Sequence, residues 1–569
     1  MKVQFRVVAG VAALSLALTA CAGAKEKKAA QQPSANPSAS AAAMAIPASD
    51  LKPTPRDQVA DGGTMTWPIS SMPEQWNPSH FDGWTGDLND LLGGTVSHPF
   101  LFNDKAEPTM DKDFVLDAKL ETTPKQTVTY TLNPKAVWSD GKPITAADYI
   151  GMWKAQNGSN EKFRVVSTTG YELMDSVTQG KDEFEVVTTY KSPYPDWKGM
   201  FDFLVPAALT KDADAFDNLW KEKPLVSAGP FILDKIDKTD KTATFIRNPK
   251  WWGEPAKLDK IVYRALDLTA QAGAFANGEI DFFTIGSDVA NYEKAKAVAD
   301  ADIRKANTPD YRHFTFSTVS ELFKDLKVRQ AIALAINREA VAKADLNGLD
   351  WPIQTVGNHI FLNTQTGYKD NSSEWGTYQP DKAKTMLDEA GWKLAQGDKF
   401  RKKDGKELTI DFMIPAGVAN SKQEAEITQT MLAEVGAKVT IDTVPLDKFF
   451  TDYVNTGKFD ITAFRWGGTP FPVSSSLSIF RTPEKDNIRQ NYGRGGSADI
   501  DKLLLSASTE FDPAKAADLV SQADKLIWEQ VMTFPLYQYP GAVAVKKKLV
   551  NFGSFGFANY DYLNIGFTK

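Results

Sequence analysis

The residue types that most often carry out chemistry are few in this chain and lie far apart. It has one cysteine, Cys21, and four histidines, at positions 80, 98, 313 and 359. Such wide spacing does not predict a metal cluster, and a lone cysteine forms neither an internal disulfide nor a paired-cysteine metal site. The sequence contains no nucleophile elbow, zinc-protease helix, phosphate-binding loop or calcium loop. We therefore predict neither an enzyme nor a cofactor or metal site.

Cys21 ends an export signal. Residues 1–6 form a short basic segment. The apolar run that follows at 7–18 has about a dozen residues, which is too short to cross a bilayer. The sequence LTAC at 18–21 resembles the lipobox of bacterial lipoproteins, in which the thiol receives a diacylglycerol before cleavage. We predict that residues 1–21 are a lipoprotein signal peptide and that Cys21 anchors the mature protein on the outer face of the cell membrane. A chance cysteine in an ordinary cleavable signal is the alternative.

Composition divides the rest of the chain in two. Residues 22–61 are rich in Ala, Pro, Ser, Lys and Gln with almost no aromatic residues, so we expect a disordered tether. The following stretch of about 500 residues is large enough for two or three domains. The net charge of -7, with acidic and basic residues intermixed, argues against nucleic acid as a partner.

Strand and helix patterns alternate along this stretch. Residues 127–132 alternate as a strand with one buried face, and Thr145 begins a helix with a capping box. Further on, a strand at 408–414, a helix starting at a second capping box at 421–424 and a strand at 439–443 predict a right-handed parallel crossover. Two further helices are expected at 328–336 and 380–390. The pattern indicates an α/β protein.

Four segments then carry a family resemblance. They are WSDGKPITAAD at 138–148, AGPF at 228–231 followed by RNPKWWG at 247–253 and LDKI at 258–261, VRQAIALAINR at 328–338, and PDKAKTMLDEAGW at 380–392. In this order and spacing they resemble the peptide and nickel class (family 5) of extracellular solute-binding proteins, and in particular its oligopeptide-binding lipoproteins. Members of this family are the receptors of ABC importers.

The resemblance implies a two-lobed periplasmic-binding-protein-like clamshell of the large cluster-C type with an additional inserted domain. The ligand would lie between the lobes, which close about a hinge. The closed form would dock on permease subunits driven by a separate ATPase, and we expect a monomer. The implied boundaries are 62–108, 227–308 and 536–569 for lobe I, 109–226 for its inserted domain, and 309–535 for lobe II.

The resemblance also implies ligand contacts near the end of the first strand and on a strand-loop of lobe II. An extended peptide can pair with exposed backbone groups there, and Gly467 and Gly468 would permit close backbone approach. Ordinary core packing is an equal interpretation of Trp84, Trp466 and Phe471, and internal loop contacts are the simpler one for Asn358 and His359. The predicted ligand-binding residues are His80, Phe81, Asp82, Gly83, Trp84, Asn358, His359, Arg465, Trp466, Gly467, Gly468, Thr469 and Phe471.

One residue departs from the family pattern. Thr469 stands where peptide-binding relatives carry an aspartate that pairs with the free amino terminus of the ligand. A neutral hydroxyl cannot supply that charge-assisted bond. Asp82 could supply the charge from the other lobe, or the ligand could be a blocked peptide, a signalling peptide or another compound.

Three functions stay open at this point. The leading one is a receptor for peptide import. A receptor for another solute, such as a sugar, metallophore or cofactor, and a surface sensor or adhesion lipoprotein that reuses the scaffold are the alternatives.

Overall fold

The computed structural model describes residues 46–569 except 84, 485 and 486. The predicted signal peptide, Cys21 and most of the predicted tether lie outside this range. Residues 46–61, the end of that tether, lie against the folded body, because Asp50 bridges to Ser554 and Val59 is fully buried. No helix among the described residues is long and apolar enough to cross a membrane.

A four-stranded sheet is built from the beginning and the middle of the chain. Its order is β1-β10-β9-β8, in which β1 and β10 are parallel and the other pairs antiparallel. Trp67 of β1 is buried and makes edge-on contacts with Phe552 and Tyr560, so the C-terminal segment completes the core of this sheet. The strands are β1 (Thr64–Ile69), β8 (Phe231–Asp237), β9 (Thr242–Arg247) and β10 (Lys260–Ala265).

An antiparallel sheet with the order β4-β5-β7-β6 packs with helix α2 (Ala146–Gln156). The strand predicted at 127–132 is β5, with its alternate residues buried. The predicted capping box at the start of α2 is present, because Thr145 and Asp148 bond reciprocally. The strands are β4 (Val115–Glu121), β5 (Thr127–Leu132), β6 (Met174–Gln179) and β7 (Glu185–Tyr190).

The third sheet has six strands in the order β11-β18-β12-β17-β15-β16. β15 is parallel to both β16 and β17, and α9 connects β15 to β16, so the predicted parallel crossover is confirmed. The elements are β11 (Phe282–Thr284), β12 (Ala301–Phe316), β15 (Thr409–Pro415), β16 (Lys438–Val444), β17 (Ile461–Gly467), β18 (Thr533–Lys546) and α9 (Ala419–Glu434).

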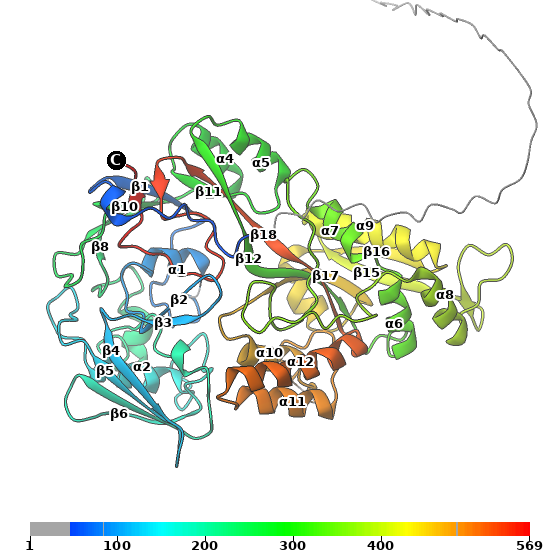
Figure 1. Ribbon diagram of the computed structural model, residues 1–569, viewed down its shortest axis with the longest axis horizontal. Coiled ribbons are helices and arrows are strands. Elements are labelled where there is room, and N and C mark those ends of the chain that lie inside the picture. Colours follow the sequence, from blue (N-terminus) through cyan, green and yellow to red (C-terminus); the bar gives the residue numbers. More distant parts are fainter. Residues whose placement is uncertain (1–45, 84, 485–486) are drawn as a thin grey trace, which may run out of the picture. The chain divides into compact units, whose positions relative to one another are not determined.

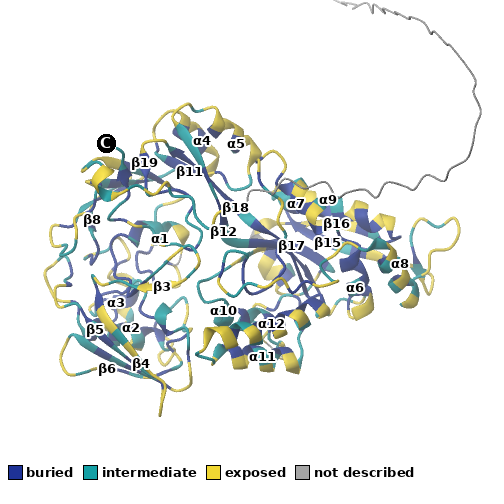
Figure 2. Cartoon of the chain, in the orientation of Figure 1, coloured by how far each residue is buried: buried dark blue, intermediate teal, exposed yellow. Residues whose placement is uncertain are grey.

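Two groups of helices pack with this sheet, as Figure 1 shows. The helices α6 to α9 share one apolar cluster with its strands, and α10 to α12 form a second. The central strands are largely buried, whereas the helices expose their outer residues (Figure 2). The further helices are α6 (Leu326–Leu334), α7 (Arg338–Asp345), α8 (Pro380–Glu389), α10 (Pro472–Phe480), α11 (Ala498–Ser508) and α12 (Pro513–Gln530).

The remaining described elements are short or peripheral. They are α1 (Gly86–Leu92), β2 (Phe100–Phe102), β3 (Pro108–Met110), α3 (Ala213–Asn218), α4 (Leu268–Ala276), α5 (Val289–Lys296), β13 (Lys402–Lys403), β14 (Lys406–Glu407), β19 (Leu549–Val550) and β20 (Gly566–Phe567), together with short 3₁₀ or π turns at Arg56–Gln58, Trp197–Gly199, Leu446–Lys448 and Phe449–Val454.

The long strands β12 and β18 run side by side in Figure 1, and β18 contributes to two apolar cores. Val543 and Val545 of β18 pack with the four-stranded sheet, whereas Phe314 and Phe316 of β12 pack with helices α6 to α9. Between these halves the pairing of β12 with β18 shifts register across residues 307–311. Proline, which stands at 309, lacks the N–H that a regular ladder needs.

The second predicted capping box is wrong. α9 begins two residues earlier, at Ala419, and Ser421 and Glu424 are buried within it. Glu424 instead forms a buried, bidentate ion pair with Arg312 of β12. The Ser-x-x-Glu pattern was misleading because a tertiary partner, not the helix amino end, satisfies the carboxylate.

This ion pair yields a stability prediction. Replacing Glu424 by Gln removes the bidentate ionic partner of the buried Arg312 guanidinium, which should lower the unfolding free energy by about 3–5 kcal/mol. Urea denaturation of the ligand-free protein measures it. The matched control is Glu321→Gln, which removes an exposed ion pair with Lys324 and should change stability by less than about 1 kcal/mol. Equal effects of the two variants would contradict a structural role for the buried pair.

Candidate functional site

Parallel strands in this protein end at two edges. In open α/β sheets, ligands bind beyond the carboxyl ends of such strands. In the six-stranded sheet, β17 ends at Gly467 and continues into the predicted segment that reaches Phe471. In the four-stranded sheet, the parallel strands β1 and β10 end at Ile69 and Ala265. These two edges are the candidate ligand-binding regions.

Trp466 points to one face of the six-stranded sheet. It lies opposite Tyr311 in the strand pairing and stacks on Tyr492 and on His313, with ring centroids 5.5 Å and 5.7 Å away. Burial raises the pKa of Tyr492 above its ordinary value. Trp466 therefore has an aromatic packing role, whatever else it contacts.

Arg465 points to the opposite face, as alternation along a strand requires. Its Nη1 lies 3.1 Å from Asp310 Oδ2, and its guanidinium lies over the ring of Tyr539, 4.5 Å from the centroid. About half of the Arg465 side chain, 47%, is exposed. It is a charged group at the carboxyl end of β17 that solvent can reach.

The two glycines after Trp466 differ. A Cβ on Gly468 would lie 2.4 Å from the Pro309 carbonyl oxygen, which accepts the Gly468 N–H at 2.7 Å, so only glycine fits there. A Cβ on Gly467 would meet only Asp310 Oδ1, at 3.6 Å. Gly467 therefore has open space where the strand ends, and Gly468 is required by the chain itself.

Thr469 and Phe471 have internal partners. The Thr469 hydroxyl accepts the Phe471 N–H at 3.1 Å and bonds to Ser475 at 3.2 Å, which fixes the entry to α10. The Phe471 ring makes an edge-on contact with Phe102, 5.3 Å between centroids, and covers Gly199. Both residues thus shape the loop after β17.

The predicted segment at 80–84 lies well past the end of the first strand, since β1 ends at Ile69. His80 is buried, with Nε2 3.2 Å from Asp217 Oδ1, and Arg164 donates to Asp82 at 2.8 Å. Phe81 is 66% exposed, Gly83 has space only for a hydrogen, and Trp84 lies outside the described residues. Among the described residues of this segment, 80–83, no hydrogen bond, ion pair or ring contact reaches 465–471, and its ligand role stays a prediction.

Asn358 and His359 also have internal partners. His359 is buried, with Nδ1 2.8 Å from Asp524 Oδ1 and Nε2 2.9 Å from the Thr533 carbonyl oxygen. The Asn358 side chain accepts two backbone N–H groups of the following turn. These contacts match the simpler interpretation from the sequence.

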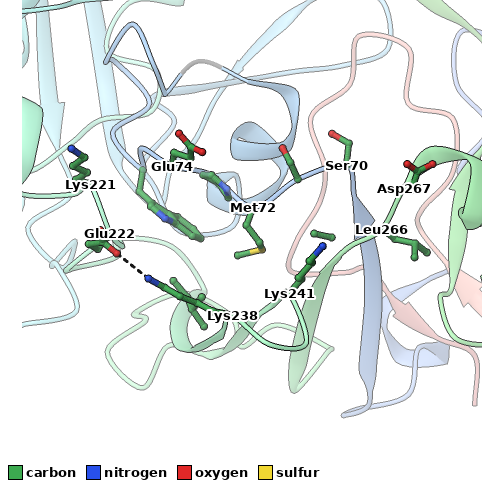
Figure 3. A pocket seen from close by; sticks show the side chains of 14 residues that line it. Ser70, Met72, Glu74, Lys221, Glu222, Lys238, Lys241, Leu266 and Asp267 are labelled. Carbon is green, nitrogen blue, oxygen red and sulfur yellow. Dashed lines mark hydrogen bonds and ion pairs between the residues drawn. The ribbon is translucent and has the colours of Figure 1, made fainter.

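Sequence reasoning missed a cavity at the carboxyl ends of β1 and β10. It has a volume of about 710 Å³, within the usual range for small-molecule sites. Figure 3 shows Met72 in the middle of this cavity, with Lys238 and Lys241 opposite and Glu222 joined to Lys238. The sequence offered one signal for this cavity, because the strand TMTWPI ends directly before Ser70. Its lining includes Ser70, Ser71, Met72, Pro73, Glu74, Trp76, Lys221, Glu222, Lys238, Lys241, Leu266 and Asp267.

Comparisons with known proteins agree with this architecture. The model of the bacterial extracellular solute-binding proteins, family 5 (middle), matches residues 116–487. The oligopeptide-binding protein OppA of Mycobacterium tuberculosis H37Rv is 36% identical over 526 residues, which cover 92% of this chain and 87% of that protein.

Solved structures show the same fold. A periplasmic EDTA-binding protein, EppA, superposes with a TM-score of 0.81 at 27% identity, covering 91% of this chain and 98% of that one. The oligopeptide-binding protein AppA of Bacillus subtilis, in complex with a nonapeptide, gives a TM-score of 0.70 at 21% identity, covering 90% and 100%.

The fold and the matches define a solute-binding receptor rather than an enzyme. This chain belongs to the bacterial extracellular solute-binding proteins of family 5. The predicted α/β fold, a two-lobed periplasmic-binding-protein clamshell, is thereby confirmed.

The stacking of Trp466 gives a second prediction. Replacing Trp466 by Ala should lower the unfolding free energy of the ligand-free protein by about 2–4 kcal/mol, because the ring packs against Tyr492 and His313. Chemical denaturation measures the loss. The control Phe81→Ala removes an exposed ring and should stay within about 0.5 kcal/mol of the unaltered protein. An undiminished stability of Trp466→Ala would instead assign this residue to ligand contact alone.

Proposed function

We propose that this protein is a lipid-anchored receptor that captures peptides outside the cell and delivers them to the permease of an ABC importer. The observation that carries the proposal is the 36% identity to an oligopeptide-binding protein over 92% of this chain. The carboxyl end of β17 supports it, because β15 pairs only with Ile461 and Thr462 of this strand, so that side of residues 463–467 has no partner among the described strands. An extended peptide can pair there irrespective of its sequence.

Two regions supply the ligand contacts in this proposal. In lobe II they are Arg465 to Phe471, supported by the exposure of Arg465 and the open space at Gly467. In lobe I they are the segment after β1 and the 710 Å³ cavity around Met72. The residues His80 to Trp84, Asn358 and His359 stay in the proposal as secondary candidates, because each described one already has an internal partner or faces solvent.

Hinge closure would join the two regions. β18 contributes to both apolar cores, and the register shift in its pairing with β12 at 307–311 coincides with the expected lobe boundary at 309. A ligand that contacts both lobes favours the closed state by the difference between its affinities for the closed and open states. The corresponding organisation is a monomer. Its lobe I comprises 62–108, 227–308 and 536–569, its inserted domain comprises 109–226, and its lobe II comprises 309–535.

A non-peptide solute is the second candidate. The observation that favours it is the similarity to the EDTA-binding protein EppA, which is 27% identical with a TM-score of 0.81. Thr469, in place of the aspartate expected for a peptide amino terminus, points the same way.

Native mass spectrometry distinguishes the two candidates. The purified protein should carry a ladder of peptide masses that disappears on denaturation, since a closed receptor retains its ligand. A single non-peptide mass would overturn the peptide proposal in favour of the second candidate.

A bulky residue at the end of β17 tests the site itself. Gly467→Phe should fold, because a Cβ there has ordinary contacts, and should reduce the retained ligand about tenfold or more by blocking the strand end. The matched control is Gly273→Phe, on α4, where a Cβ meets nothing within 4 Å. Equal ligand content of the two variants would count against a ligand at Gly467.

The anchor is tested separately. Cys21→Ser should leave peptide binding in solution unchanged but reduce uptake by cells, because the tether no longer raises the local concentration of receptor at the permease. Membrane fractionation and uptake of a labelled peptide measure the two effects. Unchanged uptake would remove the role assigned to the lipid.

A further inference from the structure

Another cavity, outside both candidate ligand regions, lies between α1, β2 and the C-terminal loop at 555–563. Its volume of about 570 Å³ is within the usual range for small-molecule sites. α1 and β2 lie next to each other in Figure 1, and the N–H of Phe102 in β2 donates to Asn559 Oδ1 of the loop at 2.6 Å. None of the predicted ligand-binding residues lines this cavity. The proposed function therefore does not account for it.

Aromatic side chains form much of its wall. The Tyr562 and Tyr263 hydroxyls both donate to the Asp90 carbonyl oxygen, at 2.9 Å and 2.7 Å, so α1 is tied to the C-terminal loop and to β10. The faces of aromatic rings carry partial negative charge and attract a cation within about 6 Å of the ring centre. The aromatic lining includes Phe114, Phe203, Trp251, Phe555, Tyr560 and Tyr562.

Three carboxyl groups of the lining lack a counter-charge. Asp90, Asp111 and Asp113 line the cavity, no lysine or arginine does, and none of the three forms an ion pair with a described residue. Burial raises the pKa of Asp90 to about 7; a hydrogen bond with Tyr560 acts to lower it, and repulsion by Asp87 adds to the rise. Burial likewise raises the pKa of Asp111 to about 6. A cation in the cavity would stabilise these carboxylates and so gain binding free energy.

The basic side chain in the lining, His98, is already paired. Its Nδ1 lies 2.5 Å from Asp202 Oδ1, and its Nε2 lies 3.2 Å from the Gly93 carbonyl oxygen. Although burial acts to lower it, Asp202 raises the pKa of His98 above its ordinary value. Both ring nitrogens face acceptors and carry hydrogen, so the imidazolium charge is balanced by Asp202, which does not line the cavity.

An unsatisfied acceptor also belongs to the lining. The Asn89 side-chain oxygen is enclosed, yet it accepts no hydrogen bond from any described residue. Such acceptors are rare in native structures, because a buried oxygen without a donor has lost its bonds to water. Aromatic faces and carboxylates suit any cation, whereas this oxygen favours one that carries N–H groups.

We propose that this cavity is an additional binding site, which takes an organic cation with N–H donors, namely an alkylammonium or guanidinium group. The carboxylates supply the counter-charge, the Asn89 oxygen accepts an N–H, and the aromatic rings cover the apolar part of the ligand. The cationic group belongs to a free amine or to a lysine or arginine side chain of a captured peptide. This inference goes beyond the proposed function and does not depend on it.

The first experiment uses two matched probes and the unaltered protein. Phenethylamine and 2-phenylethanol have the same skeleton, but the first carries an ammonium group where the second has a neutral hydroxyl. Calorimetry on the full chain, freed of retained ligand by unfolding and refolding, should find that phenethylamine binds about 10- to 100-fold more tightly, the gain expected for bonds between charged groups. Equal affinities, or binding of neither probe, would overturn the inference.

The second experiment removes one carboxylate at a time. Asp90→Asn and Asp111→Asn should each reduce the preference for phenethylamine about tenfold while leaving the affinity for 2-phenylethanol unchanged, because the amide keeps the shape but not the charge. The matched control is Asp117→Asn, which changes an exposed aspartate of β4 and should preserve the preference. Thermal melting confirms that the variants are folded. A preference undiminished in both cavity variants would contradict the inference.

The pH dependence gives a readout without substitution. Affinity for phenethylamine should rise between about pH 6 and about pH 8, because Asp90 loses its proton near pH 7 while an alkylamine, with a pKa near the roughly 10.4 of lysine, stays charged. The acidic groups of the lining other than Asp90 are Asp111, Asp113 and the exposed Asp561. Burial keeps the tyrosine pKa values above their ordinary range, so these neighbours stay neutral. A flat profile would overturn the role of Asp90. The titratable groups next to it are Asp87, Tyr263, Tyr560 and Tyr562.

Peptides released from the purified protein distinguish the two sources of the cation. If it is a side chain, lysine or arginine should occur at one fixed position in these peptides. If it is a free amine, the peptides should show no such enrichment, and the peptide-loaded protein should still bind phenethylamine. Failure of the cation site in the probe experiments would leave the proposed receptor function standing, because that function is judged by the masses that the protein retains.

Discussion

The antiparallel pairing of β12 with β18 is the constraint on which the rest of the structure depends. Segments that are hundreds of residues apart in sequence, 301–315 and 533–546, form one antiparallel ladder with register shifts at 307–311 and 312–313. Val543 and Val545 of β18 are buried with the four-stranded sheet, whereas Ala542 and Ala544 of the same strand lie in the core that contains helices α6 to α9. β18 therefore belongs to two cores, and its pairing with β12 is interrupted at 307–311.

The same strands relate the interior of the protein to its candidate site. Arg312 of β12 forms the buried pair with Glu424 of α9, which fixes that helix against the sheet. Asn420 lies one turn earlier on α9, on the same side of the helix, where it approaches Ser287. A charge pair in the core thereby sets the position of polar groups at the rim beside Arg465.

Peptides of different sequence share few features that a receptor can recognise, namely the backbone and the charged ends. The open strand end at Gly467 suits the first, and the half-exposed Arg465 suits the second.

Local sequence patterns were enough to predict the secondary-structure elements, because alternation, helical periodicity and proline or cap signals act over a few residues. β5, α2, α8 and the crossover through α9 were all predictable in this way. The family followed from four short segments. Ser421 and Glu424 were misinterpreted because a local pattern cannot report a partner more than a hundred residues away. Likewise, two features exist only where distant strands meet. They are the cavity around Met72 at the end of β1, and the cluster of Arg465 with Asp310, Tyr539 and Ser287. These features could be found only in the folded structure. Each is a contact between segments far apart in the chain, and the sequence does not say which distant segments come close in space.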